Sequence, residues 1–296
     1  MTTATISAAN VSSERKARKI IKPYQGMVAW PSVVLAFGII GAFALVCTLG
    51  TLRIIPLWAG LIINSLLLYA IQTPLHEACH GNIAGRDSSW MWLNHLIGML
   101  CGAILIHDYK AFRHIHLMHH RETNDDVLDP DHWVKVKHPL VVLFRCFTIV
   151  PFYNHFFFQK IALNPKDPSN FKVTAHVLAA YWVLYSLAFW LCVFGYWRET
   201  LALWLGPHWI GSAIIIYFFA YLPHKPHDTK NRWLATKIVK ISGPWAKLVN
   251  WVYMFQNYHL IHHLYPRIPF YLYPDAFQDL KPVLEKEGSR IYEYGH

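Results

Sequence analysis

The chain has 296 residues, of which 54% are hydrophobic, 16% aromatic and only 15% charged. Soluble globular proteins carry about 25% charged residues, so this composition indicates a membrane protein and excludes a disordered chain, a collagen and a small disulfide scaffold. The net charge of +10 fits the basic loops on one side of a bilayer protein, and we do not expect the chain to bind nucleic acid.

Residues 1–26 are polar and then basic, without the early apolar stretch and cleavage site of a signal peptide. We predict that they form a cytoplasmic N-terminal tail. Beyond them, four stretches meet the requirement of about 20 mostly apolar residues for a spanning helix. They lie at residues 27–49, 54–73, 173–196 and 200–222. Short turns join the first two and the last two, so we predict two helical hairpins that begin and end in the cytoplasm.

Two further apolar stretches, at residues 90–106 and 139–158, are less suited to crossing the bilayer. The first is short, and the second is interrupted by Arg145, Pro151 and His155. Histidine clusters lie on both sides of residues 90–106, and clusters that share one site must lie on one side of the membrane. We therefore expect both stretches to be re-entrant or interfacial helices.

The predicted fold class is an all-α membrane protein with four transmembrane helices in two hairpins, these interfacial or re-entrant helices, and a cytoplasmic histidine-rich cap. The membrane domain occupies residues 27–275. Residues 276–296, in which acidic and basic side chains alternate with apolar ones, are predicted to form a cytoplasmic C-terminal tail.

Three histidine clusters carry the chemistry. They are His76 and His80; His116, His119 and His120; and His259, His262 and His263. Residues three and four apart share one face of a helix, so each cluster projects its imidazoles in one direction. Neutral imidazole binds zinc, copper, iron and nickel, whereas burying so many polar rings without partners would cost several kcal/mol. We therefore predict a metal centre.

The histidines outside the three clusters are weaker candidates for metal ligands. His224 follows the fourth apolar stretch and is a ninth candidate ligand, and His227 is a weaker tenth. Isolated histidines are expected to be structural; these are His95, His155, His176 and His208.

Two competing motifs overlap the first cluster. His76-Glu77-Ala-Cys-His80 matches HExxH, in which a zinc peptidase uses the glutamate as general base. A single zinc would leave six cluster histidines without a role. Glu77-x-x-His80 is also half of the carboxylate-bridged di-iron signature of helix bundles, which needs a second Glu-x-x-His and two further inward glutamates on the other helices. Eight or nine imidazoles are too many for one ion, so we predict two, and reduction of dioxygen at a lipid surface favours iron.

The order and spacing of the clusters resemble the three histidine boxes of the membrane fatty-acid desaturase superfamily, over roughly residues 55–275. Within it, the chain is most similar to bacterial beta-carotene ketolases and carotenoid ring hydroxylases. Three segments carry that similarity: YLPHKPH at residues 221–227, the aspartate-rich run at 119–131, and YHLIHHLYP at 258–266. The first box reads HEACHG where ketolases usually have HDAMHG, and the chain is longer than typical bacterial ketolases.

The resemblance implies a dioxygen-dependent di-iron enzyme that oxidises unactivated C–H bonds of a lipophilic substrate taken from the bilayer. A carotenoid ring ketolase or hydroxylase is the first expectation. A fatty-acyl desaturase, hydroxylase or alkene-forming decarboxylase is the alternative. The resemblance further implies an active site on the cytoplasmic face of a bacterial inner membrane, with nine iron ligands: His76, His80, His116, His119, His120, His224, His259, His262 and His263.

Polar residues beside the boxes have two open interpretations. Asp125, Asp126, Asp129 and Asp131 follow the second box. They either accept the ring N–H groups of ligands and fix their tautomer, or form a solvated acidic loop. Asn257 precedes the third box and either binds metal-bound water or caps the helix.

The electrons must come from another protein. The five cysteines are scattered and include no CxxC pair, so they indicate neither disulfides nor an iron–sulfur cluster. A haem-binding segment and a glycine-rich dinucleotide fingerprint are also missing. We expect a ferredoxin-type or other external reductase. Lys225, Lys230, Arg232 and Lys237 either dock an acidic ferredoxin or reflect only the charge bias of cytoplasmic loops.

Overall fold

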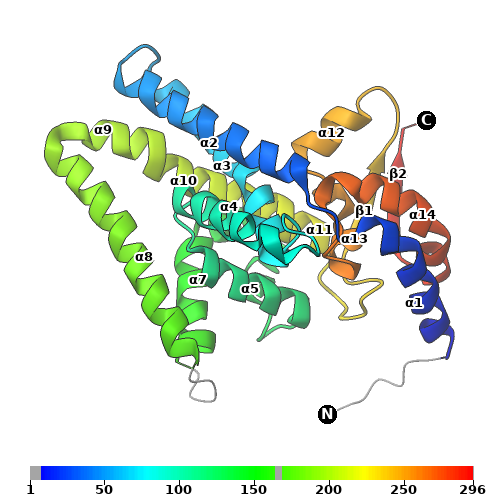
Figure 1. The fold of residues 1–296 in the computed structure, drawn as a ribbon. Helices are drawn as coiled ribbons and strands as arrows, with labels where there is room; N and C mark the ends of the chain where they lie inside the picture. Colours follow the sequence, from blue (N-terminus) through cyan, green and yellow to red (C-terminus); the bar gives the residue numbers. More distant parts are fainter. Residues whose placement is uncertain (1–7, 164–168, 296) are drawn as a thin grey trace.

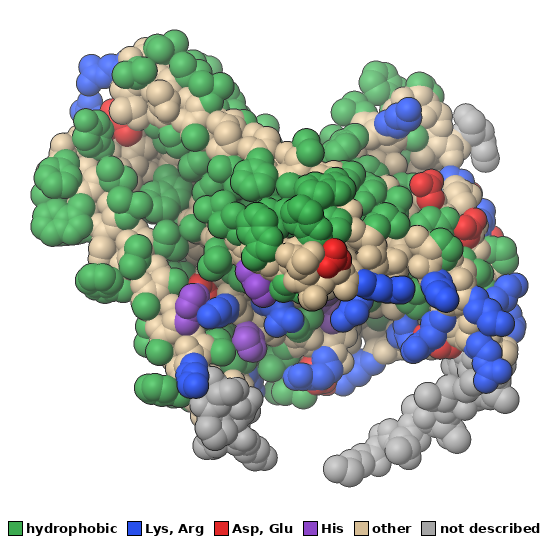
Figure 2. Space-filling view, viewed as in Figure 1, with side chains coloured by type: hydrophobic (Ala, Val, Ile, Leu, Met, Phe, Trp, Pro, Cys, Tyr) green, Lys and Arg blue, Asp and Glu red, His purple; other side chains and the backbone are tan. Residues whose placement is uncertain are grey.

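The computed structural model describes residues 8–163 and 169–295. Residues 1–7 of the predicted N-terminal tail and the last residue of the predicted C-terminal tail lie outside that part. The described chain is mostly helical, with one small sheet (Figure 1). Hydrophobic side chains cover α2 and α8, whereas Lys and Arg side chains gather on the side where α1 lies (Figure 2).

The first hairpin consists of α2 (Trp30–Thr51) and α3 (Leu57–His80), and each helix is long and apolar enough to cross a membrane. Helix α3 continues beyond the predicted span and carries the first histidine cluster on its last turns. Gly81, with a φ of 74°, ends α3 in the left-handed conformation that glycine adopts readily.

The second predicted hairpin is a single helical stretch of 55 residues, Asn170–His224. It is too long for one crossing, and the chain turns back at Gly195, whose φ of 94° is outside the helical range. Figure 1 shows α8 leading to this turn and α10 leading back toward α3. The elements of the stretch are α8 (Ser169–Leu191), η5 (Cys192–Tyr196), α9 (Trp197–Thr200), η6 (Leu201–Leu205), α10 (Gly206–Ile215), η7 (Ile216–Tyr221) and α11 (Leu222–His224).

Two helix pairs are sharply bent. Helices α4 (Met91–Ile104) and α5 (Tyr109–Glu122) meet in a bend of 99°, and α6 (Pro139–Phe147) and α7 (Ile149–Phe157) belong to a pair bent by 62°. The first bend returns α5 to the end of α3, where the Tyr109 hydroxyl donates to the carbonyl of Ala78 at 3.0 Å. Within the described residues, three helical stretches can cross a membrane by length and composition, or up to five if each bent pair counts as one span.

Short helical turns link these elements. They are η1 (Lys22–Tyr24) after α1 (Ala8–Ile21), η2 (Ser88–Trp90), η3 (Pro130–Val134) and η4 (Phe158–Ala162).

The C-terminal part forms a cap with its own core. Its elements are β1 (Lys237–Ile241), α12 (Ala246–Val252), η8 (Gln256–Tyr258), α13 (His259–Leu264), η9 (Phe270–Leu272), α14 (Tyr273–Lys286) and β2 (Arg290–Tyr294). Phe277 and Leu280 of α14 are fully buried in one hydrophobic cluster with Ile21 of α1 and Leu264 of α13. The segment predicted as a C-terminal tail therefore begins inside a packed helix, and the boundary at residue 275 coincides with no gap in the packing.

Strands β1 and β2 pair in parallel, with Lys237 opposite Arg290 and Ile241 opposite Tyr294. The all-α prediction missed this sheet. Each strand is short, and the partners lie far apart in the sequence, so local periodicity does not reveal the pairing.

Candidate metal centre

Four helices bring all nine predicted ligands together: α3, α5, α11 and α13. They form two groups, in each of which one potential ligand atom per residue lies within 4.8 Å of the others. The first group is His76, His80, His116, His120 and His262. The second group is His119, His224, His259 and His263.

Each group contains histidines from more than one box, because α5 and α13 each contribute histidines to both groups. His116 and His120, four residues apart on α5, share a face and join the first group, whereas His119 joins the second. On α13, His259 and His263 join the second group and His262 joins the first. Both groups therefore need α5 and α13 to pack against each other.

The ring nitrogens of neighbouring histidines face one another. In the first group, the Nε2 atoms of His80 and His116 are 2.8 Å apart, and the Nε2 of His120 lies 3.1 Å from His116 and 2.8 Å from His262. A pair of neutral imidazoles can share only one proton. Nitrogens bound to one ion at about 2.1 Å and at right angles lie about 3.0 Å apart, so this spacing fits a metal ion.

The second group has the same spacing. The Nε2 of His263 lies 3.2 Å from that of His119 and 3.0 Å from that of His259, which is 3.0 Å from His224. Burial, followed by neighbouring histidines, lowers the pKa values of His259 and His263 well below the ordinary value, so these rings are neutral and offer the lone pairs that a metal needs. Although burial also lowers the pKa of His119, Asp129 and Asp131 raise it to about 9, so a metal would displace a proton from that ring.

His76 gives an independent test of the fit. It is 2% exposed, and neither ring nitrogen has a hydrogen-bond partner within the described residues. Leaving a buried polar group unsatisfied costs about 1–3 kcal/mol. The ring centroid lies 4.4 Å from that of His116 and 4.2 Å from that of His262, so an ion held by the first group would satisfy it.

Side chains around the second group contact the Nδ1 atoms of its rings, which face away from the cluster of Nε2 atoms. The Nδ1 of His119 is 2.7 Å from Asp129 and 3.4 Å from Asp131. The Nδ1 of His259 lies 2.6 Å from the Gln256 amide oxygen. Such contacts fix the tautomer and orientation of a ligand ring. Asp129 and Asp131 are both buried, and Tyr153 donates a hydrogen bond to Asp131.

The other two aspartates lie elsewhere. Asp125 accepts from Lys230, and this hydrogen bond holds the Asp125 pKa well below its usual range. Asp126 accepts from Lys135 at 2.6 Å. Each interpretation of the aspartate run therefore applies to half of it. Asp125 and Asp126 form ion pairs in a loop, whereas Asp129 and Asp131 contact a histidine of the second group.

Asn257 and His227 are near the centre but belong to neither group. The Asn257 amide donates to the carbonyl of Val239 at 3.0 Å and to the side chain of Asn250 at 2.9 Å. It ties the third box to β1, and α13 has no side-chain cap. The ring of His227 stacks 5.9 Å from that of His224.

Three residues behind the rings were not predicted. They are Gln256, Thr123, whose hydroxyl is 3.4 Å from His263 Nδ1, and Tyr273, whose hydroxyl is 3.0 Å from His262 Nδ1. Gln256 precedes His259 by three residues, a spacing that could have identified it. Tyr273 reaches His262 from another helix, and no local pattern indicates it.

Glu77 does not fit the zinc-peptidase alternative. It is fully buried and accepts from Asn82 at 3.1 Å and from Ser32 at 3.4 Å. A general base must face the open side of the zinc, but Glu77 is in neither histidine group. The first group also combines histidines of all three boxes, which a single HExxH zinc does not need.

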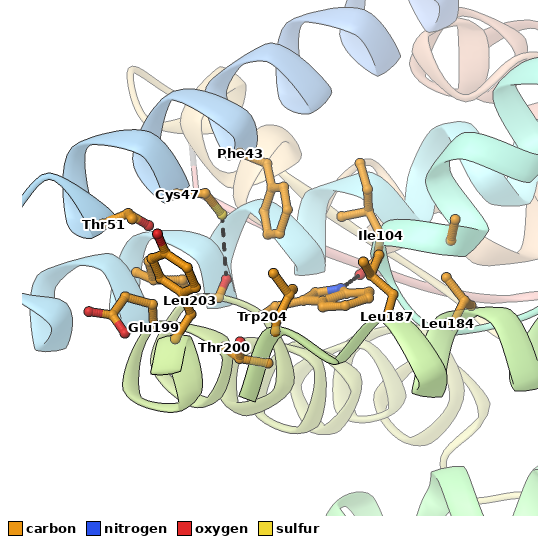
Figure 3. Close-up of a pocket in the computed structure, with 13 residues that line it drawn as sticks. Phe43, Cys47, Thr51, Ile104, Leu184, Leu187, Glu199, Thr200, Leu203 and Trp204 are labelled. Atoms are coloured by element: carbon orange, nitrogen blue, oxygen red, sulfur yellow. Dashed lines mark hydrogen bonds between the residues drawn. The ribbon is translucent and has the colours of Figure 1, made fainter. Parts of the chain in front are cut away.

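A small cavity of about 40 Å³ adjoins both groups and is lined by His76, His116, His119 and His259. Gln72 and Ser212 also line it, and each has a buried oxygen without a partner within the described residues. A larger, apolar cavity of about 570 Å³ contains none of the box histidines in its lining (Figure 3). At its wall, the Trp204 indole donates to the carbonyl of Ile104 at 2.9 Å.

A sequence model of the family described as "Fatty acid desaturase" matches residues 52–295. The chain is 24% identical over 267 residues to a Delta(9) fatty acid conjugase-like enzyme of Dimorphotheca sinuata, covering 74% of this chain and 67% of that protein. It is 24% identical over 293 residues to an sn-1 oleoyl-lipid 12-desaturase of Picosynechococcus sp., covering 90% and 79%. For a chloroplastic sn-2 acyl-lipid omega-3 desaturase (ferredoxin) of Arabidopsis thaliana, the identity is 26% over 255 residues, covering 74% and 54%.

Proposed function

The chain belongs to the fatty acid desaturase family, and on that premise we propose that it is a dioxygen-dependent di-iron oxidoreductase acting on a fatty-acyl lipid. One observation carries the proposal. Histidines of all three boxes, with His224, converge in two groups whose nitrogen spacing fits two metal ions. The groups lie at the end of α3, a helix long and apolar enough to cross a membrane.

Iron with dioxygen supplies an oxidant that can remove hydrogen from an unactivated C–H bond, which no amino-acid side chain can do. The two histidine groups would each hold one ion, and Asp129 and Gln256 would orient the rings of His119 and His259. Ile115, Ile216 and Phe219 line the small cavity and would exclude water from the reacting carbon.

For the topology, we propose four spans: α2, α3, α8 and the returning limb that contains α10. Both termini and the metal centre would then face the cytoplasm. The concentration of Lys and Arg around α1 (Figure 2) supports this orientation. The apolar cavity between α2, α8 and η6 (Figure 3) would let a lipid enter from the bilayer.

Fatty-acyl lipid replaces the carotenoid ring as the proposed substrate. The relatives named above are, by their names, fatty-acid or acyl-lipid enzymes, and none supports a carotenoid. Introducing one double bond would remove two hydrogens and would use one dioxygen, two protons and two electrons from an external donor, with release of two waters.

The test is expression in bacteria that make beta-carotene, with His262→Ala as an inactive control. Lipids and pigments are separated by chromatography with mass detection. We expect acyl chains lighter by two hydrogen atoms, absent from the control. A carotenoid that gains a ketone oxygen and absorbs further to the red would assign a ketolase instead. Iron-loaded protein that changes neither lipid nor pigment would contradict the fatty-acyl substrate.

A further inference from the structure

The metal centre is not fully buried. His80, His116, His120 and His263 keep part of their surface exposed, whereas the other five histidines of the two groups are buried. The exposed rings are neighbours: the centroid of His80 lies 4.8 Å from those of His116 and His120, and His120 lies 4.4 Å from His263. The four partly exposed rings are therefore contiguous.

A basic groove of about 480 Å³ lies beside the segment that follows His263. Its cationic lining residues are Arg18, Lys22, Arg86, Arg232 and Arg267, and residues 264–267 also line it. Glu14, the acidic residue of the lining, pairs with Arg18 at 2.7 Å and with Arg232 at 3.3 Å. Lys22, Arg86 and Arg267 are exposed and have no ion pair within the described chain.

Hydrogen bonds join this groove to the metal centre. The Asn82 amide donates to the carbonyl of Pro266 at 3.0 Å and to Glu77 at 3.1 Å, which holds the lining against the end of α3. Arg267 and Arg113 are close enough to act electrostatically on His80, and Arg113 donates to the carbonyl of Cys79 at 3.1 Å. Leu264, which lines the groove, is bonded directly to His263, one of the partly exposed histidines.

We propose that this groove is the docking surface for the small acidic electron-transfer protein that reduces the metal centre, an inference that rests on the proposed function. Three unpaired cations around a concave surface attract an acidic partner and orient its approach. The partner's redox group would approach the partly exposed imidazoles, which belong to both histidine groups.

The basic surface predicted from the sequence is less suited to this role. Lys230 is paired with Asp125, and Lys237 is half-buried in β1. Lys225 is exposed beside the ring of Tyr221. Of the four residues predicted to dock a donor, only Arg232 lines the groove.

The test measures binding of an oxidised plant-type [2Fe–2S] ferredoxin to the full chain in phosphatidylcholine nanodiscs, over a range of NaCl concentrations. The groove variant combines Lys22→Glu, Arg86→Glu and Arg267→Glu. The matched control has the same change in charge at three exposed lysines outside the groove, through Lys225→Glu, Lys247→Glu and Lys286→Glu. We expect the groove variant to lose at least about ten-fold in affinity at low salt, with a shallower salt dependence, and the control to lose less than about two-fold.

Reduction kinetics give the second readout. Reduced ferredoxin should reduce the iron of the groove variant more slowly than that of the control, whereas dithionite should reduce both at the same rate. Unchanged ferredoxin affinity in the groove variant, or equal weakening in both variants, would overturn the proposal. Binding of phosphatidylglycerol vesicles is measured in parallel for both variants. If the groove variant lost this binding but kept its affinity for ferredoxin, the groove would bind lipid headgroups and the proposal would be wrong. If the unchanged protein bound no iron, or if dithionite did not reduce its iron, the proposed function would be contradicted. The ferredoxin-binding measurement would still test the groove in that case.

Discussion

The two histidine groups differ in what surrounds them. Behind the second group, Asp129 contacts His119 and Gln256 contacts His259. The first group has one such partner in the described chain, the hydroxyl of Tyr273 on His262, and Arg113 and Arg267 lie near His80. The second group thus has three buried rings, one of them held by carboxylates, and the first group has three partly exposed rings and is flanked by cations.

This difference indicates different tasks for two similar sets of imidazoles. A carboxylate behind a ligand ring makes the ring more basic and favours the higher positive charge on a metal. Nearby guanidinium groups favour the lower charge. We therefore expect an ion in the first group to accept an electron first, and an ion in the second group to be held more firmly.

Removing a ligand of the first group should have the largest effect. His120→Ala deletes a ring whose Nε2 lies within 3.1 Å of both His116 and His262. We expect the iron content to fall from two ions to one and activity to fall below detection, because the second group shares no ligand with the first. Elemental analysis with Mössbauer spectroscopy measures both. Two ions retained in this variant would contradict the division into groups.

Removing the carboxylate charge behind the second group should have the next largest effect. Asp129→Asn keeps the size of the side chain but weakens its contact with His119. Changing a group that hydrogen-bonds the outer nitrogen of a ligand ring costs about 10–100-fold in metal affinity. Competition with a chelator should show this loss in one of the two ions only. Asp126→Asn, at an exposed residue paired with Lys135, is the matched control and should change neither ion.

Removing a neutral partner should cost less. Gln256→Leu deletes the hydrogen bond to His259 Nδ1 and should cost about 1 kcal/mol, or about five-fold in affinity for the second ion. The same chelator competition measures it. A loss as large as that of Asp129→Asn would show that ring orientation, rather than charge, distinguishes the two groups.

The smallest expected effect is that of mild acid on metal binding by the first group. An ordinary histidine has a pKa of about 6.5, but burial lowers the pKa values of His259, His262 and His263 far below that. These rings lose their neutral form only when the pH falls through the lowered values, so they carry no proton for iron to displace at pH 6. We expect the affinity of the metal-free protein for the ion of the first group, where burial also lowers the pKa values of His116 and His120, to change by less than about two-fold between pH 8 and pH 6. The second group differs: although burial lowers the pKa of His119, Asp129 and Asp131 raise it to about 9, so an ion there must displace a proton. A steep fall in affinity for both ions over that interval, in anaerobic titrations, would contradict this expectation.

Acid should nevertheless decrease the free energy of unfolding before it weakens metal binding by the first group. In the unfolded chain these histidines take up protons below about pH 6.5, whereas in the folded protein they do not. The free energy of unfolding should therefore decrease as the pH falls below that value.

Local spacing was sufficient to identify the nine histidines as a set. Imidazoles three and four residues apart on a helix must share a side of it, and all nine come together in the structure. Spacing could not divide them, since the assignment of His119 and His262 to opposite groups depends on how α5 and α13 pack. Nor could it separate Asp129 from Asp125, because both lie in one acidic run and only the course of the loop decides which one reaches a histidine.

The same distinction holds for the fold. Runs of apolar residues determine by themselves that α2 and α3 are long apolar helices, because burial in lipid depends on a contiguous segment. The β1–β2 pairing, the burial of α14 against α1, and the groove beside the partly exposed histidines bring together segments distant in the sequence. Those features depend on contacts between segments rather than on the composition of any one of them, and for that reason only the tertiary structure decided them.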